Sequence, residues 1–163
     1  MGDSADGGGL VSGYSDEPKP LAAYATLALL FNAGVAGALL AGRRRLPERV
    51  GVRDVVLMGV ASHKVSRVLA KDKPMSFLRA PFVRYDGDAG EGEVSETPRG
   101  EGMRRAVGEL LVCPYCLSPW VAAGYATGLL FSPRATRWVG SIFGAVTVSD
   151  FLQLAFRSAR EQA

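Results

Sequence analysis

The two cysteines of this 163-residue chain stand three residues apart, in the segment Cys113-Pro114-Tyr115-Cys116, directly ahead of a long apolar run. Two thiols at this spacing permit three kinds of chemistry. They can cycle between a dithiol and a disulfide, supply two of the four ligands of a zinc ion, or act as small packing residues or a static disulfide at a helix entrance. The sequence leaves all three hypotheses open.

The redox hypothesis depends on Cys116, which precedes a helix start predicted at Ser118-Pro119. The free N–H groups and the dipole of such a helix would stabilise a thiolate at Cys116. The metal hypothesis adds His63, the single histidine, to Cys113 and Cys116 and takes zinc as the cofactor. Apart from zinc, the sequence predicts no cofactor.

A second candidate set consists of charged residues in or beside apolar segments: Lys64, Arg67, Asp72, Arg79, Glu109 and Asp150. Ionisable groups at membrane depth are costly, so they pair with one another or line a polar pathway. Asp150 is the clearest case, with Lys64 or Arg67 as its expected partner. The alternatives are a structural salt bridge between helices and a basic cradle for a lipid phosphate. No Ser-His, His-Asp or paired-carboxylate motif accompanies the set, so the sequence does not favour an enzyme.

Three apolar runs are long enough to position these residues as membrane-spanning helices, near 21–42, 110–131 and 138–156. The first run ends at Arg43-Arg44-Arg45, whereas the tail before it is mainly acidic. Because cytoplasmic loops are enriched in Lys and Arg, this asymmetry predicts an outside N-terminus and a cytoplasmic arginine cluster.

A fourth helix is predicted over 52–70, with a cationic stripe along one face. Such a helix either lies in the membrane interface or spans with its stripe turned towards other helices. Residues 71–85 follow, where basic residues alternate with aromatic ones, as is typical of the lipid headgroup region. An ordinary loop packed on the helices is the alternative for this segment.

The expected fold class is all-α: a small helical integral membrane protein with three to four transmembrane helices. Residues 1–20 are predicted to form a disordered tail, and residues 86–102 a flexible acidic loop, because both are rich in Gly, Asp and Glu. The predicted organisation is therefore a tail over 1–20, an additional transmembrane helix over 21–42, and a helical membrane domain over 52–158.

The chain resembles an uncharacterised bacterial membrane family, catalogued as domain of unknown function 1360, over roughly residues 54–156. The resemblance rests on the segment 61–85 together with the run Gly108-Glu109-Leu110-Leu111-Val112-Cys113-Pro114-Tyr115-Cys116-Leu117-Ser118-Pro119-Trp120. The positions that match the family pattern are Lys64, Arg67, Asp72, Arg79, Pro81, Phe82, Gly108, Glu109, Cys113, Cys116 and Trp120. His63 is not among them. The resemblance implies a membrane protein, with some relatives labelled sporulation proteins, and it supplies no activity.

The sequence therefore predicts a multi-pass protein of the bacterial cell membrane that acts as a structural or interaction module. The alternative is a membrane dithiol redox protein, or a thiol or metal sensor, that uses Cys113 and Cys116. Trp120 is the predicted interfacial anchor. The expected partners are the bilayer with its anionic headgroups, and a second copy or another membrane protein, since Gly140 and Gly144 permit close helix contact. No aromatic-basic motif for nucleic acid is present.

Overall fold

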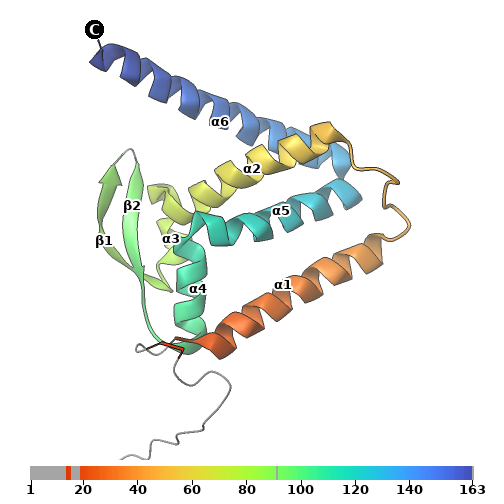
Figure 1. The fold of residues 1–163 in the computed structure, drawn as a ribbon, viewed down its shortest axis with the longest axis horizontal. Coiled ribbons are helices and arrows are strands. Elements are labelled where there is room, and N and C mark those ends of the chain that lie inside the picture. The colour runs from red at the N-terminus through yellow and green to blue at the C-terminus, as the bar shows by residue number, and fades with distance from the viewer. Residues whose placement is uncertain (1–13, 16–18, 91, 163) are drawn as a thin grey trace, which may run out of the picture.

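The computed structural model describes residues 14–15, 19–90 and 92–162, which form helices and one β-hairpin (Figure 1). The elements in chain order are α1 (Leu21–Gly42), α2 (Val52–Lys71), the 3-10 turn η1 (Lys73–Met75), α3 (Ser76–Arg79), β1 (Val83–Gly90), β2 (Glu93–Pro98), α4 (Gly102–Val112), α5 (Pro114–Phe131) and α6 (Pro133–Glu161). The predicted disordered tail over 1–20 lies almost wholly outside the described residues.

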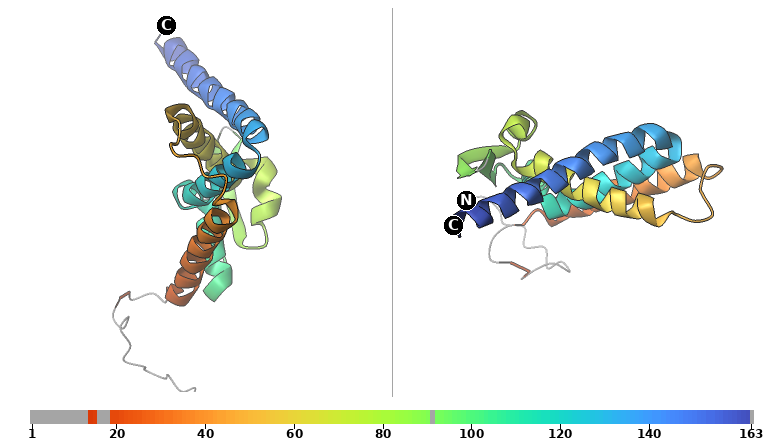
Figure 2. Two further views of the ribbon diagram at one scale, coloured as in Figure 1. Left: turned by 90° about the vertical axis from the view of Figure 1, so that its right-hand side faces the viewer. Right: turned by 90° about the horizontal axis from the view of Figure 1, so that it is seen from above.

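Four long helices, α1, α2, α5 and α6, run lengthwise through the molecule, and successive ones point in opposite directions (Figures 1 and 2). Helix α2 packs against both α5 and α6. The α1–α2 loop and the α5–α6 turn therefore lie at one end of these helices. Helix α4, α3 and the hairpin lie at the other end, which we call the hairpin end (Figure 1).

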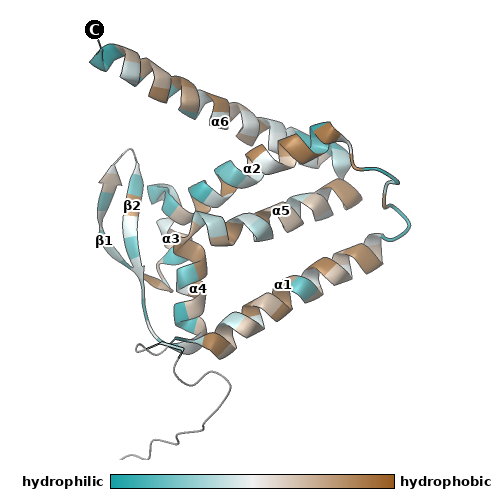
Figure 3. Cartoon of the chain, in the orientation of Figure 1, coloured by the Kyte–Doolittle hydropathy of each residue, from teal (hydrophilic) through white to brown (hydrophobic). Residues whose placement is uncertain are grey.

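Helices α1 and α6 are long and apolar enough to cross a membrane, with mean hydropathies of 1.7 and 1.5. Only 6% of the α1 window and 11% of the α6 window is buried inside the protein. Figure 3 shows the apolar colouring along α1. The α1 bounds match the predicted span, and α6 extends the predicted 138–156 at both ends. The described residues thus contain two candidate spans, or three if α4 and α5 together form one. The predicted number of three to four transmembrane helices is therefore not confirmed.

The predicted span over 110–131 is not one straight helix. Helices α4 and α5 meet at Cys113 with a bend of 85°. Cys113 has φ −108° and ψ 103°, an extended conformation. Proline disfavours the helical conformation in the residue before it, so Pro114 ends α4 and begins α5. The helix start predicted at Ser118-Pro119 is therefore wrong, and Pro119 lies inside α5.

The predicted helical fold is confirmed in the main, but the segment predicted as a loop over 86–102 contains most of a two-stranded sheet, so the fold is not wholly α-helical. Strands β1 and β2 pair antiparallel from Val83↔Pro98 to Gly90↔Glu93, with register shifts on the β1 side. Gly90 and Gly92 turn the chain with φ of +85° and +82°, which side-chain-bearing residues rarely adopt. Glu96 points inward although it is charged. The sequence therefore lacks the alternation of apolar and polar residues that usually identifies a half-buried strand.

The glycines of α6 serve packing within the chain. A methyl group added at Gly140 would clash with the Tyr125 side chain of α5, and one at Gly144 would lie 3.7 Å from Leu57 Cδ1 of α2. These contacts place the small-residue face of α6 against its own neighbours.

Candidate functional site

Arg79, at the end of α3, is completely buried and holds the hairpin end together. Its Nε donates to Glu96 Oε2 at 2.5 Å, and the Glu96 side chain is only 5% exposed. Nη1 donates to the Leu69 carbonyl at 2.7 Å, and Nη2 to the Asp72 carbonyl at 3.2 Å and Ser76 Oγ at 3.1 Å. One guanidinium thus joins α2, α3 and β2. Arg79 was predicted as a site residue from the sequence, whereas Glu96 fell in the predicted loop and was not.

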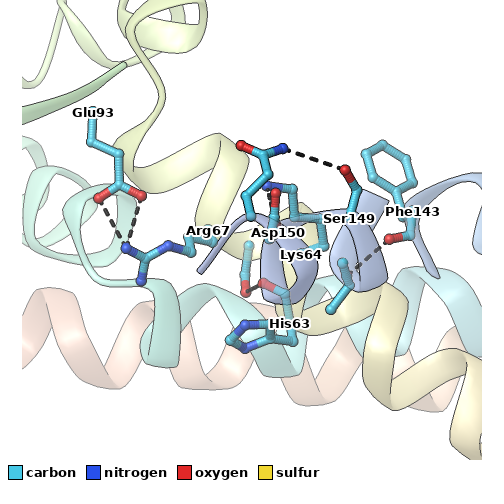
Figure 4. A network of polar contacts seen from close by, with 10 residues as sticks. His63, Lys64, Arg67, Glu93, Phe143, Ser149 and Asp150 are labelled. Atoms are coloured by element: carbon cyan, nitrogen blue, oxygen red, sulfur yellow. Dashed lines mark hydrogen bonds and ion pairs between the residues drawn. The ribbon is translucent and has the colours of Figure 1, made fainter. Parts of the chain in front are cut away.

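The cationic stripe of α2 faces carboxylates from two different elements (Figure 4). Lys64 Nζ lies 2.8 Å from Asp150 Oδ2 of α6, and Arg67 Nη2 lies 2.8 Å from Glu93 Oε1 of β2. The Lys64 side chain is 14% exposed. Of the two partners considered for Asp150, the structure brings Lys64 to it. These cations face carboxylates, so the arrangement is an ion-pair network and not an open basic cradle.

A further ion pair between α2 and α6 was not found from the sequence. Arg137 donates to both carboxylate oxygens of Asp54, through Nε at 2.9 Å and Nη2 at 2.8 Å. Bidentate pairs of this kind fix orientation as well as charge. Together with Lys64–Asp150, this pair connects α2 to α6 at two points.

Glu109 belongs to a separate contact between α4 and α1. It accepts a hydrogen bond from the Tyr24 hydroxyl, and its other oxygen lies 3.1 Å from Arg105 Nε, one turn earlier in α4. Trp120, the predicted interfacial anchor, packs edge-to-face on Phe31 of α1, with ring centroids 5.2 Å apart. Both residues position α1, which makes few other contacts.

The carboxyl group of Asp72 lies just after α2, close to the network. Burial raises the pKa of Asp72 above its ordinary value, and Glu93 adds to the shift. The cations Lys64, Arg67 and Arg79 oppose it. Ionisation of Asp72 therefore lowers the stability of the folded state.

We expect Asp72→Asn to raise the melting temperature of the detergent-solubilised protein at pH 7. The folded state holds the Asp72 proton more tightly than the unfolded chain, so this group's contribution to stability falls as pH rises through its folded-state pKa. The gain from Asp72→Asn should accordingly shrink as the pH is lowered towards 4. If Asp72→Asn instead lowered the melting temperature at pH 7, and this effect disappeared in acid, attraction of Asp72 to the cations would dominate.

Asp88→Asn is the matched control, with the opposite sign. Lys73 Nζ lies 2.7 Å from Asp88 Oδ2, and the Tyr85 hydroxyl donates to Oδ1 at 2.7 Å. These hydrogen bonds lower the pKa of Asp88. Its contribution is present above the unfolded-state pKa and is lost as pH falls through the folded-state value. Asp88→Asn should lower the melting temperature at pH 7 and have no effect in acid.

Cys113 and Cys116 are free thiols at the bend between α4 and α5. Cys113 is the N-cap of α5, and its Sγ accepts a hydrogen bond from the Cys116 backbone N–H at 3.2 Å. The redox hypothesis placed Cys116 ahead of a helix start. In the structure, Cys116 lies within the first turn of α5. The geometry gives Cys113 a capping role.

Cys113→Ala is expected to lower the free energy of unfolding by about 1 kcal/mol, the usual cost of losing an N-cap. Cys113→Ser should retain wild-type stability, because the hydroxyl oxygen can accept the same bond. Thermal unfolding in detergent measures both, with the exposed Cys116→Ala as control. Equal losses for Cys113→Ser and Cys113→Ala would refute the capping role.

The zinc ligand set does not assemble. Among the described residues, no three side chains of the types His, Cys, Asp and Glu lie together in a way that could hold a metal ion. His63 is exposed on α2, and its ring takes no part in the two ion pairs drawn in Figure 4. The candidate residues thus separate into the Cys pair at the α4–α5 bend, the charged residues around α2, and the contacts of Glu109 and Trp120 with α1.

Comparisons with known proteins give a family and one curated relative. A family model described as a protein of unknown function, DUF1360, matches residues 57–156. The sporulation protein YjcA of Bacillus subtilis (strain 168) is 32% identical over 88 residues, which cover 52% of this chain and 75% of that protein. No solved structure matches.

Proposed function

The chain belongs to the DUF1360 family of unknown function, and from this premise we propose that it is a non-catalytic membrane module, held in the bilayer by its apolar helices. The observation that carries the proposal is the exposure of α1 and α6. Large apolar side chains stand out from both, including Leu29 at 71%, Leu30 at 58%, Phe151 at 65% and Leu152 at 65% exposed. Soluble monomers rarely expose contiguous apolar surface on this scale.

We further propose that α1 and α6 span, that α4 and α5 cross as a broken span, and that α2 crosses among them. An isolated α2 would carry its cationic stripe into lipid at high cost. The pairs Lys64–Asp150 and Asp54–Arg137 offset this cost, because in each of them a charged side chain of α2 meets one of opposite charge on α6. Ionisable groups within membranes usually pair in this way.

The hairpin end supplies the surface of this module. Phe77 and Leu78 of α3 are 69% and 47% exposed, and Tyr85 of β1 is 59% exposed. Arg84, which precedes Tyr85 in β1, has a side chain that is 75% exposed. Apolar and basic side chains mixed in this way suit the headgroup region, where aromatic rings and cations are both stable.

The arginines favour one orientation. Arg43, Arg44, Arg45 and Arg49 cluster in the α1–α2 loop, and Arg134 lies near the α5–α6 turn at the same end. At the hairpin end, several cations are paired, as in Arg79–Glu96 and Lys73–Asp88. The arginine end is therefore the stronger attractant for anionic cytoplasmic lipid, and we assign it to the cytoplasm.

Site-directed cysteine labelling of intact cells tests both embedding and orientation. In a background of Cys113→Ser and Cys116→Ser, the reporters are Ser95→Cys on β2 and Gly51→Cys in the α1–α2 loop. A membrane-impermeant maleimide should label Ser95→Cys in intact cells, and Gly51→Cys only after lysis. The reverse pattern would overturn the orientation, and release of the protein from membranes by alkaline carbonate would overturn the embedding.

No specific observation favours the dithiol alternative, and the capping contact of Cys113 accounts for the position of one of its two thiols. The relationship to a sporulation protein suggests the cellular process in which to seek a phenotype. Deletion of the gene should be scored for spore formation, with the Arg79→Ala variant as a complementation control that lacks a stable hairpin end.

A further inference from the structure

An apolar cleft of about 600 Å³ opens between α1, the α1–α2 loop, α2 and α5. Its walls include Val35 and Leu39 of α1, Met58 of α2, and Ala126 and Leu130 of α5. Ligand pockets in proteins typically measure about 300–1,000 Å³ and have mainly apolar walls with a few polar groups. The cleft meets both conditions.

The cleft continues as a shallow groove between α1 and α5. A second hollow of about 160 Å³ shares Val35, Ala123 and Thr127 with the first and ends near Phe31 and Trp120. A methyl group added at Gly34 would have nothing within 4 Å. The two helices are thus spaced apart here, and an elongated apolar space runs along them.

Arginines surround the cleft at its loop end. Arg45, Arg49 and Arg137 all line it. Arg137 is engaged by Asp54, and Arg45 lies with its guanidinium carbon 5.5 Å from the centre of the Phe131 ring. Within the described part of the chain, neither Arg45 nor Arg49 forms an ion pair with a carboxylate. The cleft therefore combines apolar walls with two arginines, Arg45 and Arg49, that pair with no carboxylate of the described residues.

We propose that this cleft binds one anionic phospholipid, with an acyl chain between α1 and α5 and the phosphate against Arg45 and Arg49. An elongated apolar space fits an acyl chain, and charge complementarity at its end selects an anionic headgroup. Arginine is suited to phosphate because its planar donors match the phosphate oxygens. The inference rests on the proposed membrane embedding, since that places the cleft within reach of lipid.

The test uses the full chain, purified in a non-ionic detergent, with lipid binding followed by native mass spectrometry and by melting temperature. Phosphatidylglycerol should bind and raise the melting temperature. Phosphatidylcholine with the same acyl chains, and glycerol phosphate without chains, should do neither. Stabilisation by glycerol phosphate alone would identify a site for free anions, and equal binding of both lipids would remove the charge selectivity; either result overturns the proposal.

Two double variants provide a matched comparison. Arg45→Gln/Arg49→Gln should bind phosphatidylglycerol roughly 30-fold more weakly, because each arginine near an anionic headgroup contributes about five-fold. Arg43→Gln/Arg44→Gln removes the same charge from the same cluster but not from the cleft, and should bind as wild type. Equal losses in the two would indicate a general effect of charge and would overturn the site.

A filling variant tests the acyl chain. Ala126→Phe places a large ring in the cleft and should abolish phosphatidylglycerol binding without releasing the protein from membranes. Unchanged binding would overturn the assignment of the chain to the cleft. Carbonate extraction of the same variants separates the two proposals: a protein that stays in the membrane but shows no lipid preference refutes the lipid site alone.

Discussion

Arg79→Ala is expected to lower the melting temperature of the purified protein by roughly 6–20 °C. Removing one partner of a buried ion pair costs about 3–5 kcal/mol, and each kcal/mol corresponds to about 2–4 °C in a chain of this size. The Arg79 side chain is fully buried and makes four polar contacts. Its loss would leave the carboxylate of Glu96 buried without its cation.

A lysine at this position should not rescue stability. The lysine ammonium is a point charge with a different reach, whereas the guanidinium of Arg79 donates in three directions at once, to β2, α2 and α3. We expect Arg79→Lys to lower the melting temperature by at least half as much as Arg79→Ala does. Thermal unfolding followed by circular dichroism in detergent measures both.

Arg84→Ala is the matched control from the same end of the molecule. Arg84 is 75% exposed and lies 3.5 Å from Asp86, so its removal should change stability by less than about 0.5 kcal/mol. A loss for Arg84→Ala as large as that for Arg79→Ala would show that charge alone, and not burial, determines the effect.

Gly108→Ala is expected to destabilise the protein by about 1–3 kcal/mol, the usual cost of overpacking. Gly108 lies on α4 where the helix packs against the hairpin. An added methyl carbon would lie 2.6 Å from the Phe82 carbonyl oxygen and 3.2 Å from Pro98 Cβ. The carbonyl belongs to the backbone, so it cannot move aside as the end of a side chain can. The hairpin would have to shift away from α4.

Gly59→Ala tests whether this cost comes from crowding. Gly59 is also helical, in α2, but a methyl group there would meet nothing within 4 Å. Alanine is a better helix former than glycine by about 1 kcal/mol, so Gly59→Ala should stabilise the protein slightly. Opposite signs for the two substitutions, read as shifts in melting temperature, support the close α4–hairpin contact. A neutral Gly108→Ala would contradict it.

The sequence was sufficient for features that depend on neighbours along the chain. The uncharged run from Leu21 to Gly42 is apolar on every side, so it forms the helix α1 with the predicted bounds. The amphipathic helix over 52–70 appears as α2, one residue longer, because its periodicity and charges are local properties. The charged residues were selected for the same reason: an ionisable group beside apolar runs is visible without a fold.

Features that depend on partners distant in sequence were decided by the tertiary structure. Glu93 and Glu96 were assigned to a flexible loop because acidic, glycine-rich segments are usually unstructured. They lie in strand β2, which pairs with β1, and their carboxylates meet Arg67 and Arg79; no local sequence pattern records these pairings. The pair Lys64–Asp150 likewise joins residues 86 positions apart in the sequence, and it requires α2 and α6 to lie side by side.

The bend at Cys113 illustrates both contributions. The restriction that Pro114 places on the residue before it was legible in the sequence, yet the apolar composition of 110–131 favoured one continuous span. Local sterics decided where the helix breaks, whereas α4 lies at 85° to α5 with tertiary contacts to the hairpin at Gly108 and to α1 through Glu109. Composition thus determined which segments are apolar and helical, whereas long-range contacts determined how they turn and which charges meet.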